Sequence, residues 1–173
     1  MANLKRISPD GVKTALEKAD HYRLLNEPLH AESICLDVLE VEPENQHALI
    51  TLLLSLTDQF TSRLYDALKP AEGLLPRLTD EYDQRYYSGI INERWAIAQR
   101  DQGIGSASVP AWLGRAMQEY ERAEALSDGK NPDPILRWNT CARLQAKLSE
   151  NAPQPAPLTR DLHGEFSGEV PPR

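Results

Sequence analysis

Apolar residues recur at steps of three and four along most of the chain, the spacing of helices that bury one face. The pattern predicts helices over residues 12–25, 29–41, 45–60, 79–100, 110–126 and 135–149. Residues 61–76 contain Pro70, Gly73 and Pro76, which predict a kink or two short helices there. The segment 45–60 is apolar nearly all the way round, which is typical of a helix enclosed by others. The chain is therefore predicted to be all-α.

Small and aromatic residues in the first two predicted helices follow a recognisable spacing. The series is Ala19, Tyr22, Ala31, Cys35, Val38 and Pro43. It resembles the tetratricopeptide repeat, a helix-turn-helix unit of about 34 residues. The series departs from the family at four positions, where Ala15 replaces Trp, Lys18 replaces Leu, Cys35 replaces an aromatic residue and Val38 replaces a small one. Farther on, Ala116, Tyr120 and Ala123 resemble a second helix of the repeat, and Trp138 resembles the opening aromatic of another unit.

The resemblance implies a short right-handed array of three to four antiparallel helical hairpins over residues 1–150. In such arrays the first helix of each hairpin lines a concave face that holds a peptide or a helix of another protein. The leading hypothesis is therefore a non-catalytic adaptor or scaffold for protein–protein interaction. Two alternatives remain open, namely an enzyme or metal carrier built on a helical bundle and a homo-oligomerising structural subunit.

By the same resemblance, nine residues are predicted to face the partner. They are Leu16, Asp20, Leu24, Ile50, Leu54, Asp58, Asn139, Arg143 and Lys147. This surface would be apolar toward one end and basic toward the other, and it suits a peptide with an apolar anchor and a carboxylate. The alternative for Arg143 and Lys147 is a solvated face that only keeps the array soluble.

Composition narrows the function classes. The chain has 173 residues, of which 40% are hydrophobic, and its mean hydropathy is -0.53. No apolar run approaches the roughly 18 to 20 residues of a membrane span, and residues 1–9 show no secretory signal, so a cytoplasmic location is expected. The net charge of -7 without a basic cluster argues against nucleic-acid binding. Cys35 and Cys141 fall on apolar faces and are expected to be buried thiols.

Three patterns could carry chemistry, and each has a simpler explanation. Two Glu-x-x-His pairs begin at Glu27 and Glu44, but roughly 20 Å of helix separates them, so they cannot share a metal ion. The Gly103-x-Gly105 sequence follows a predicted helix rather than a strand, which favours a linker over a phosphate-binding loop. No metal, nucleotide or other cofactor is predicted. Five aromatic residues could form a ligand cage but are more typical of a core: Tyr82, Tyr86, Tyr87, Trp95 and Trp112.

The composition changes after residue 150. Residues 151–173 contain five prolines and three acids, which predicts a flexible tail outside the folded domain. Large apolar residues nevertheless recur there every four positions, at Leu158, Leu162, Phe166 and Val170. That spacing leaves the alternative that the tail docks on a groove of its own chain.

Overall fold

The computed structural model describes residues 3–104 and 107–150, apart from the side chains of residues 64 and 65. Every regular element in that part of the chain is a helix, so the predicted all-α class is confirmed for it. The α-helices are α1 (Val12–Leu24), α2 (Pro28–Leu39), α3 (Gln46–Asp58), α4 (Phe60–Leu74), α5 (Glu81–Asp101), α6 (Val109–Leu126) and α7 (Asp133–Glu150). Short 3-10 helices, η1 (Pro9–Gly11) and η2 (Leu75–Arg77), precede α1 and follow α4.

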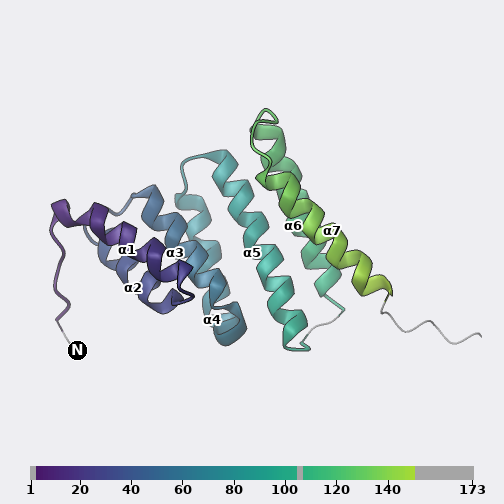
Figure 1. The fold of residues 1–173 in the computed structure, drawn as a ribbon, viewed down its shortest axis with the longest axis horizontal. Helices are drawn as coiled ribbons and strands as arrows, with labels where there is room; N and C mark the ends of the chain where they lie inside the picture. Colours follow the sequence, from purple (N-terminus) through teal and green to yellow (C-terminus); the bar gives the residue numbers. More distant parts are fainter. Residues whose placement is uncertain (1–2, 105–106, 151–173) are drawn as a thin grey trace, which may run out of the picture.

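The helices stand in a row from α1 at one end to α7 at the other (Figure 1). Each helix packs against the next one in the chain, from α1 on α2 through to α6 on α7. In addition α1 packs on α3, and α3 packs on α5, although a helix intervenes in each case. The odd-numbered helices α1, α3 and α5 are therefore direct neighbours.

The even-numbered helices bury the same spacing of residues. A small residue is followed by buried residues four and seven positions later in Ala31, Cys35 and Val38 of α2, in Ala67, Ala71 and Leu74 of α4, and in Ala116, Tyr120 and Ala123 of α6. Small side chains allow two helix backbones to approach closely, and the larger residues fill the space beside them. The core therefore runs along the whole row of helices.

Local chemistry sets several helix ends. The Asn45 side chain accepts a hydrogen bond from the Ala48 amide at the start of α3, and Asp80 accepts one from Tyr82 at the start of α5. Both bonds satisfy an amide that a helix start leaves without a partner. After α5, Gly103 adopts φ +66°, a left-handed conformation that glycine reaches without strain. These signals explain why the predicted ends of most helices lie within two residues of the observed ones.

The kink predicted within residues 61–76 is present, but the structure corrects its position and its cause. Helix α4 continues through Pro70, and its kink lies earlier, at Arg63, where φ is -130° and ψ is 38°. Pro70 is exposed, so water can hydrate the carbonyl group one turn earlier that loses its donor. At Arg63 the backbone leaves the helical conformation, and the Arg63 side chain donates hydrogen bonds to Glu32 at 3.1 Å and to Gln59 at 2.9 Å. The kink follows from this tertiary contact rather than from proline.

Two predictions concern residues that the structure does not describe. The predicted tail, residues 151–173, lies outside the described residues, and so does Gly105 of the glycine pair. The extent of the folded domain therefore stays a prediction.

Candidate binding surface on the odd-numbered helices

One carboxylate, that of Asp58 at the end of α3, connects three helices. The Arg23 Nε of α1 donates to Asp58 Oδ2 at 2.7 Å, and the Arg94 guanidinium of α5 donates to the other oxygen. The same Arg94 nitrogen also donates to Thr57 Oγ1 at 2.7 Å and to the Leu54 carbonyl at 3.3 Å. Charge-assisted hydrogen bonds of this kind hold α1, α3 and α5 together on one side of the row.

Arg137 of α7 brings a third guanidinium to this side. Its Nη1 lies 3.2 Å from Glu93 Oε1, and its charge acts on that of Arg94. We call Arg23, Asp58, Arg94 and Arg137 the charged strip. Their side chains are 23%, 21%, 22% and 35% exposed, respectively. The charged strip is therefore partly desolvated and yet open to a ligand.

The arginines of the charged strip influence one another. Burial lowers the pKa of Arg94, and the nearby charges of Arg137 and Arg23 lower it further, while Asp58 raises it. For Arg137 burial is the largest single effect and lowers the pKa, but Glu93, Tyr120 and Tyr86 together raise it on balance. Three guanidinium groups share the two carboxylates of Asp58 and Glu93. Counted together with Glu93, the strip therefore has one more positive charge than negative.

Glu93 lies beneath the strip and is itself buried, at 2% exposure. Tyr120 of α6 donates its hydroxyl hydrogen to Glu93 Oε2 at 2.6 Å, and Arg137 binds the other oxygen. Burial and the adjacent carboxylate both raise the pKa of Tyr120, which keeps the phenol neutral. A buried carboxylate is costly unless it is paired, so this arrangement fixes α5, α6 and α7 relative to one another.

An exposed leucine is next in sequence to the arginine at each end of the charged strip. Leu24, next to Arg23 in sequence, is 85% exposed, and Leu136, next to Arg137, is 59% exposed. A large apolar side chain gains free energy when a partner covers it. The odd-numbered helices thus carry a group of arginines and two exposed leucines that are next in sequence to the outer arginines.

The residues predicted on α1 and α3 lie in three different settings. Asp58 belongs to the charged strip, and Asp20 binds His47 Nε2 at 2.7 Å and the Thr51 hydroxyl at 3.0 Å. Leu24 is exposed as predicted. Leu16, however, is only 7% exposed and packs in the core, because its position on α1 faces α3. That residue is better assigned to the core than to a binding surface.

Ile50 and Leu54 are intermediate cases. Both are partly buried and pack against core clusters, and Leu54 also offers its carbonyl to Arg94. Neither is fully open to a partner. Their part in binding stays a prediction.

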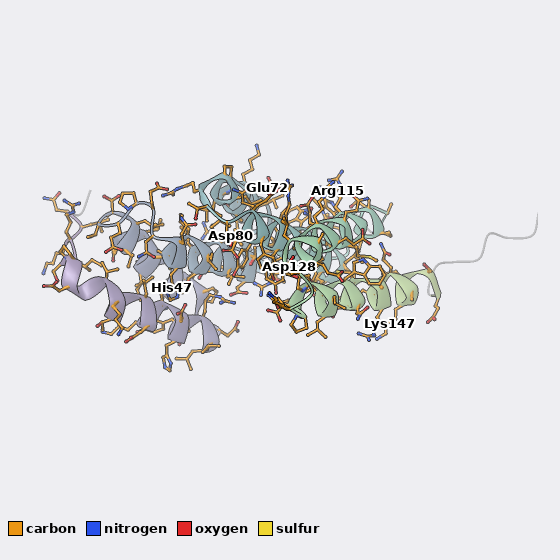
Figure 2. The ribbon with its side chains drawn as sticks, turned by 90° about the horizontal axis from the view of Figure 1, so that it is seen from above. His47, Glu72, Asp80, Arg115, Asp128 and Lys147 are labelled. Atoms are coloured by element: carbon orange, nitrogen blue, oxygen red, sulfur yellow. The ribbon has the colours of Figure 1, made fainter. Side chains whose placement is uncertain are left out.

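Two of the residues predicted on α7 lie away from its packed face. Asn139 and Arg143 lie two positions either side of fully buried Cys141, so helical geometry directs them away from the packed face. Lys147 is exposed near the end of α7 and, like His47, lies on the side away from Glu72 and Arg115 of the even-numbered helices (Figure 2). Arg137, one residue before Trp138, is the α7 side chain that binds Glu93 of α5.

The aromatic residues form two groups. Trp95 is buried at 2% exposure and meets Phe60 and Trp112 edge to face, at centroid distances of 5.5 and 6.3 Å. Tyr86 stacks on Tyr82, with 5.7 Å between the ring centroids, and meets Tyr87 edge to face. These contacts are typical of packing. The tyrosines also border the strip, since Tyr86 contributes to the pKa of Arg137 and Arg23 to that of Tyr87.

Within residues 3–104 and 107–150, no three His, Cys, Asp or Glu side chains are grouped as a metal ion would need. The two Glu-x-x-His pairs are separate there, with His30 beside Glu27 at 3.3 Å and His47 bound to Asp20. The prediction that the chain binds no metal remains a prediction. No helix in the described part has the length and apolar content to cross a bilayer.

Sequence reasoning missed the three arginines of the charged strip. None of the three was among the residues predicted to face the partner, and Arg94 and Arg137 each stand beside a tryptophan, Trp95 and Trp138. A weak signal exists, since each arginine stands next to a large apolar residue in a predicted first helix, where a charged side chain needs a partner. The identity of that partner is visible only in three dimensions.

Comparison with known proteins adds no family to this geometry. No family model, no curated protein and no solved structure matches the chain. Any function must therefore be argued from the residues themselves.

Proposed function

We propose that the chain is a non-catalytic interaction module of the tetratricopeptide type, which binds an acidic peptide or helix of another protein along the charged strip. In this proposal α1 with α2, α3 with α4, and α5 with α6 are three hairpins of a right-handed array, and α7 opens a fourth. The odd-numbered helices form the binding side.

The repeated spacing in the even-numbered helices supports the repeat assignment. The same interval of four and three residues recurs in α2, α4 and α6, and its first residue is alanine each time, at Ala31, Ala67 and Ala116. Each of these helices packs against the odd-numbered helix before it and the one after it. Repetition of one packing solution along a row is the property that makes helical repeats quasi-one-dimensional.

The charged strip supports binding of a carboxylate-bearing partner. Three partly exposed guanidinium groups and two carboxylates leave one positive charge on the surface of a chain whose net charge is -7. A planar guanidinium recognises a carboxylate through paired hydrogen bonds. Leu24 and Leu136 would supply apolar anchors on either side of this contact. This juxtaposition is the observation that carries the proposal.

Selection of binding peptides and matched leucine variants test the proposal. Peptides selected from a random library on the immobilised full chain should contain an acidic residue flanked by apolar ones. By titration calorimetry, Leu24→Glu and Leu136→Glu should weaken a selected peptide by about tenfold or more, because each removes an anchor and adds repulsion.

Leu36→Glu is the control, since Leu36 is also half-exposed but lies on α2. It should leave the affinity unchanged. Selected peptides that bind all three variants equally well would contradict the proposed surface, and so would peptides that carry no acidic residue.

A further inference from the structure

A crevice separates α6 and α7 at the start of α7. It encloses about 290 Å³ and is lined by Glu121 and Glu124 of α6 and by Ile135 and Trp138 of α7. The Trp138 indole Nε1 donates to Glu121 Oε1 at 2.9 Å, which holds the ring beside the acidic wall. Ile135 is 39% exposed. The crevice therefore presents apolar surface next to two carboxylates. Neither carboxylate belongs to the charged strip.

This chemistry specifies the kind of segment that would fit. An apolar side chain would cover Ile135 and the Trp138 ring, and a cation close to it in sequence would pair with Glu121 or Glu124. The volume accommodates one or two side chains rather than a whole helix. A short motif of one large apolar residue followed by a basic one is therefore the expected occupant.

We infer that Leu158 and Arg160 of the same chain occupy this crevice. Leu158 is the first large apolar residue after Glu150, and Arg160 follows two positions later. Ile135 lies fifteen residues before Glu150 on α7, which is about 22 Å along the helix axis. The seven residues 151–157 include prolines at 153, 155 and 157 and span about 22 Å in the polyproline conformation. The spacer thus brings Leu158 back to the level of the crevice.

The contact makes the C-terminal segment a strap along α6 and α7. Leu158 covers the side chains of Ile135 and Trp138, and the positive charge of Arg160 pairs with the negative charges of Glu121 and Glu124. The charged strip plays no part in this contact, so the strap is independent of the proposed peptide binding. Bound on the outer end of the row, it covers a face of α7 that no described helix covers.

Paramagnetic broadening in the full chain tests the strap. Burial raises the pKa of Cys35 and Cys141 to about 12, so a nitroxide reagent at neutral pH will react with an introduced cysteine in preference to them. With the label on His163→Cys, the Trp138 indole N–H signal should be lost on oxidation of the label and recovered on its reduction. The Trp138→Phe variant assigns that signal.

Charge and polarity variants give the contact its control. Leu158→Asp combined with Arg160→Glu in the labelled chain should restore the Trp138 signal, whereas Leu162→Asp should not. A Trp138 signal that is unaffected by the label, or that stays lost in the double variant, would overturn the inference.

The source of the strap is tested by mixing. Spin-labelled protein without isotope is added to isotope-labelled protein without the spin label. No broadening is expected, because the strap and crevice belong to one chain. Loss of the Trp138 signal in this mixture would assign the contact to a second copy and overturn the inference as stated.

Discussion

The hairpin of α1 and α2 and the hairpin of α5 and α6 use the same residue spacing to pack but stabilise the contact differently. In the first, Ala31, Cys35 and Val38 are all at 0% exposure and the contact is apolar. In the second, Ala116 and Ala123 again give close approach, but Tyr120 between them inserts a polar group into the core. The Tyr120 hydroxyl donates a hydrogen bond to Glu93, which Arg137 of α7 also binds.

The difference shows what a repeated pattern does and does not specify. The small residues decide how closely two helices approach, and this is common to both hairpins. The residue between them decides whether the hairpin is self-contained or depends on a neighbour. Cys35 needs no partner, whereas Tyr120 and Glu93 need each other and Arg137, so α7 completes the contact between α5 and α6.

The largest expected loss of stability comes from placing an extra atom where the Tyr120 ring lies. A Cβ atom on Gly89 would lie 2.4 Å from the Tyr120 ring, so Gly89→Ala should destabilise the fold by about 3 kcal/mol in urea denaturation. Gly73→Ala in α4 is the matched control, because nothing lies within 4 Å of its Cβ position. It should stabilise the protein by about 0.5 to 1 kcal/mol. Equal effects of the two substitutions would refute the close approach of α5 and α6.

Removal of the buried hydroxyl should have the next largest effect. Tyr120→Phe leaves Glu93 with one partner fewer and should cost about 2 kcal/mol, because hydrogen bonds to a charged group are strong when buried. Tyr22→Phe in the first hairpin is the control, since the Tyr22 ring is half-buried and stacks on His30. It should change stability by less than about 0.5 kcal/mol. A similar cost at both positions would mean that the two hairpins do not differ as described.

Alkaline pH should lower the stability of the fold. The fall should begin at a lower pH for the buried thiols than for Tyr120. Burial raises the pKa of Cys35 and Cys141 to about 12 and also raises that of Tyr120. The unfolded chain then loses protons from thiols near about pH 8.5 and from tyrosine near about pH 10, while the folded chain keeps them. Stability is therefore full below about pH 8.5 and falls above it, by at most about 1.4 kcal/mol per pH unit for each group.

Thermal unfolding between pH 7 and 11 measures this fall. Cys35→Ala should remove part of it from about pH 8.5 upward, and Tyr120→Phe should remove part of it only above about pH 10. A stability that is constant over this range, or that rises with pH, would contradict the burial of these groups.

The smallest effect is expected at the exposed face of α7. Arg143→Glu should leave the free energy of unfolding within about 0.5 kcal/mol of the parent, because Arg143 points away from the packed face. Its effect on peptide affinity separates two surfaces. Weakening comparable to that of Leu136→Glu would extend the binding surface to Asn139 and Arg143, as the repeat resemblance predicts. An unchanged affinity would confine the surface on α7 to the start of the helix.

Helix positions could be predicted because local rules dominate them. The periodicity of three and four predicted every described α-helix except α4, and residues such as Asn45 and Asp80 marked helix starts. The error in α4 shows the limit of local rules. Pro70, Gly73 and Pro76 predicted a kink or two short helices in residues 61–76, yet the kink is at Arg63, which reaches Glu32 on α2. No local pattern contains that contact.

The candidate site was less predictable than the fold. Asp58 and Leu24 were predicted from their positions on helix faces and stay predictions as binding residues. Leu16 was predicted in the same way but is buried, because a one-residue displacement from Ala15 points into the neighbouring helix. The arginines that bind Asp58 and Glu93 come from α1, α5 and α7. Their pairing spans up to 44 residues of sequence, so no spacing rule reveals it.

The sequence by itself determined which segments are helical, where most of them begin and end, and which small residues lie at the contacts, because these properties depend on residues within one or two turns of each other. Tertiary structure alone decided that Asp58 joins α1, α3 and α5 and that Glu93 is shared by Tyr120 and Arg137. A charged group that is partly desolvated must find its counterpart wherever the packing of helices brings one within about 3 Å, and that packing is a property of the whole chain.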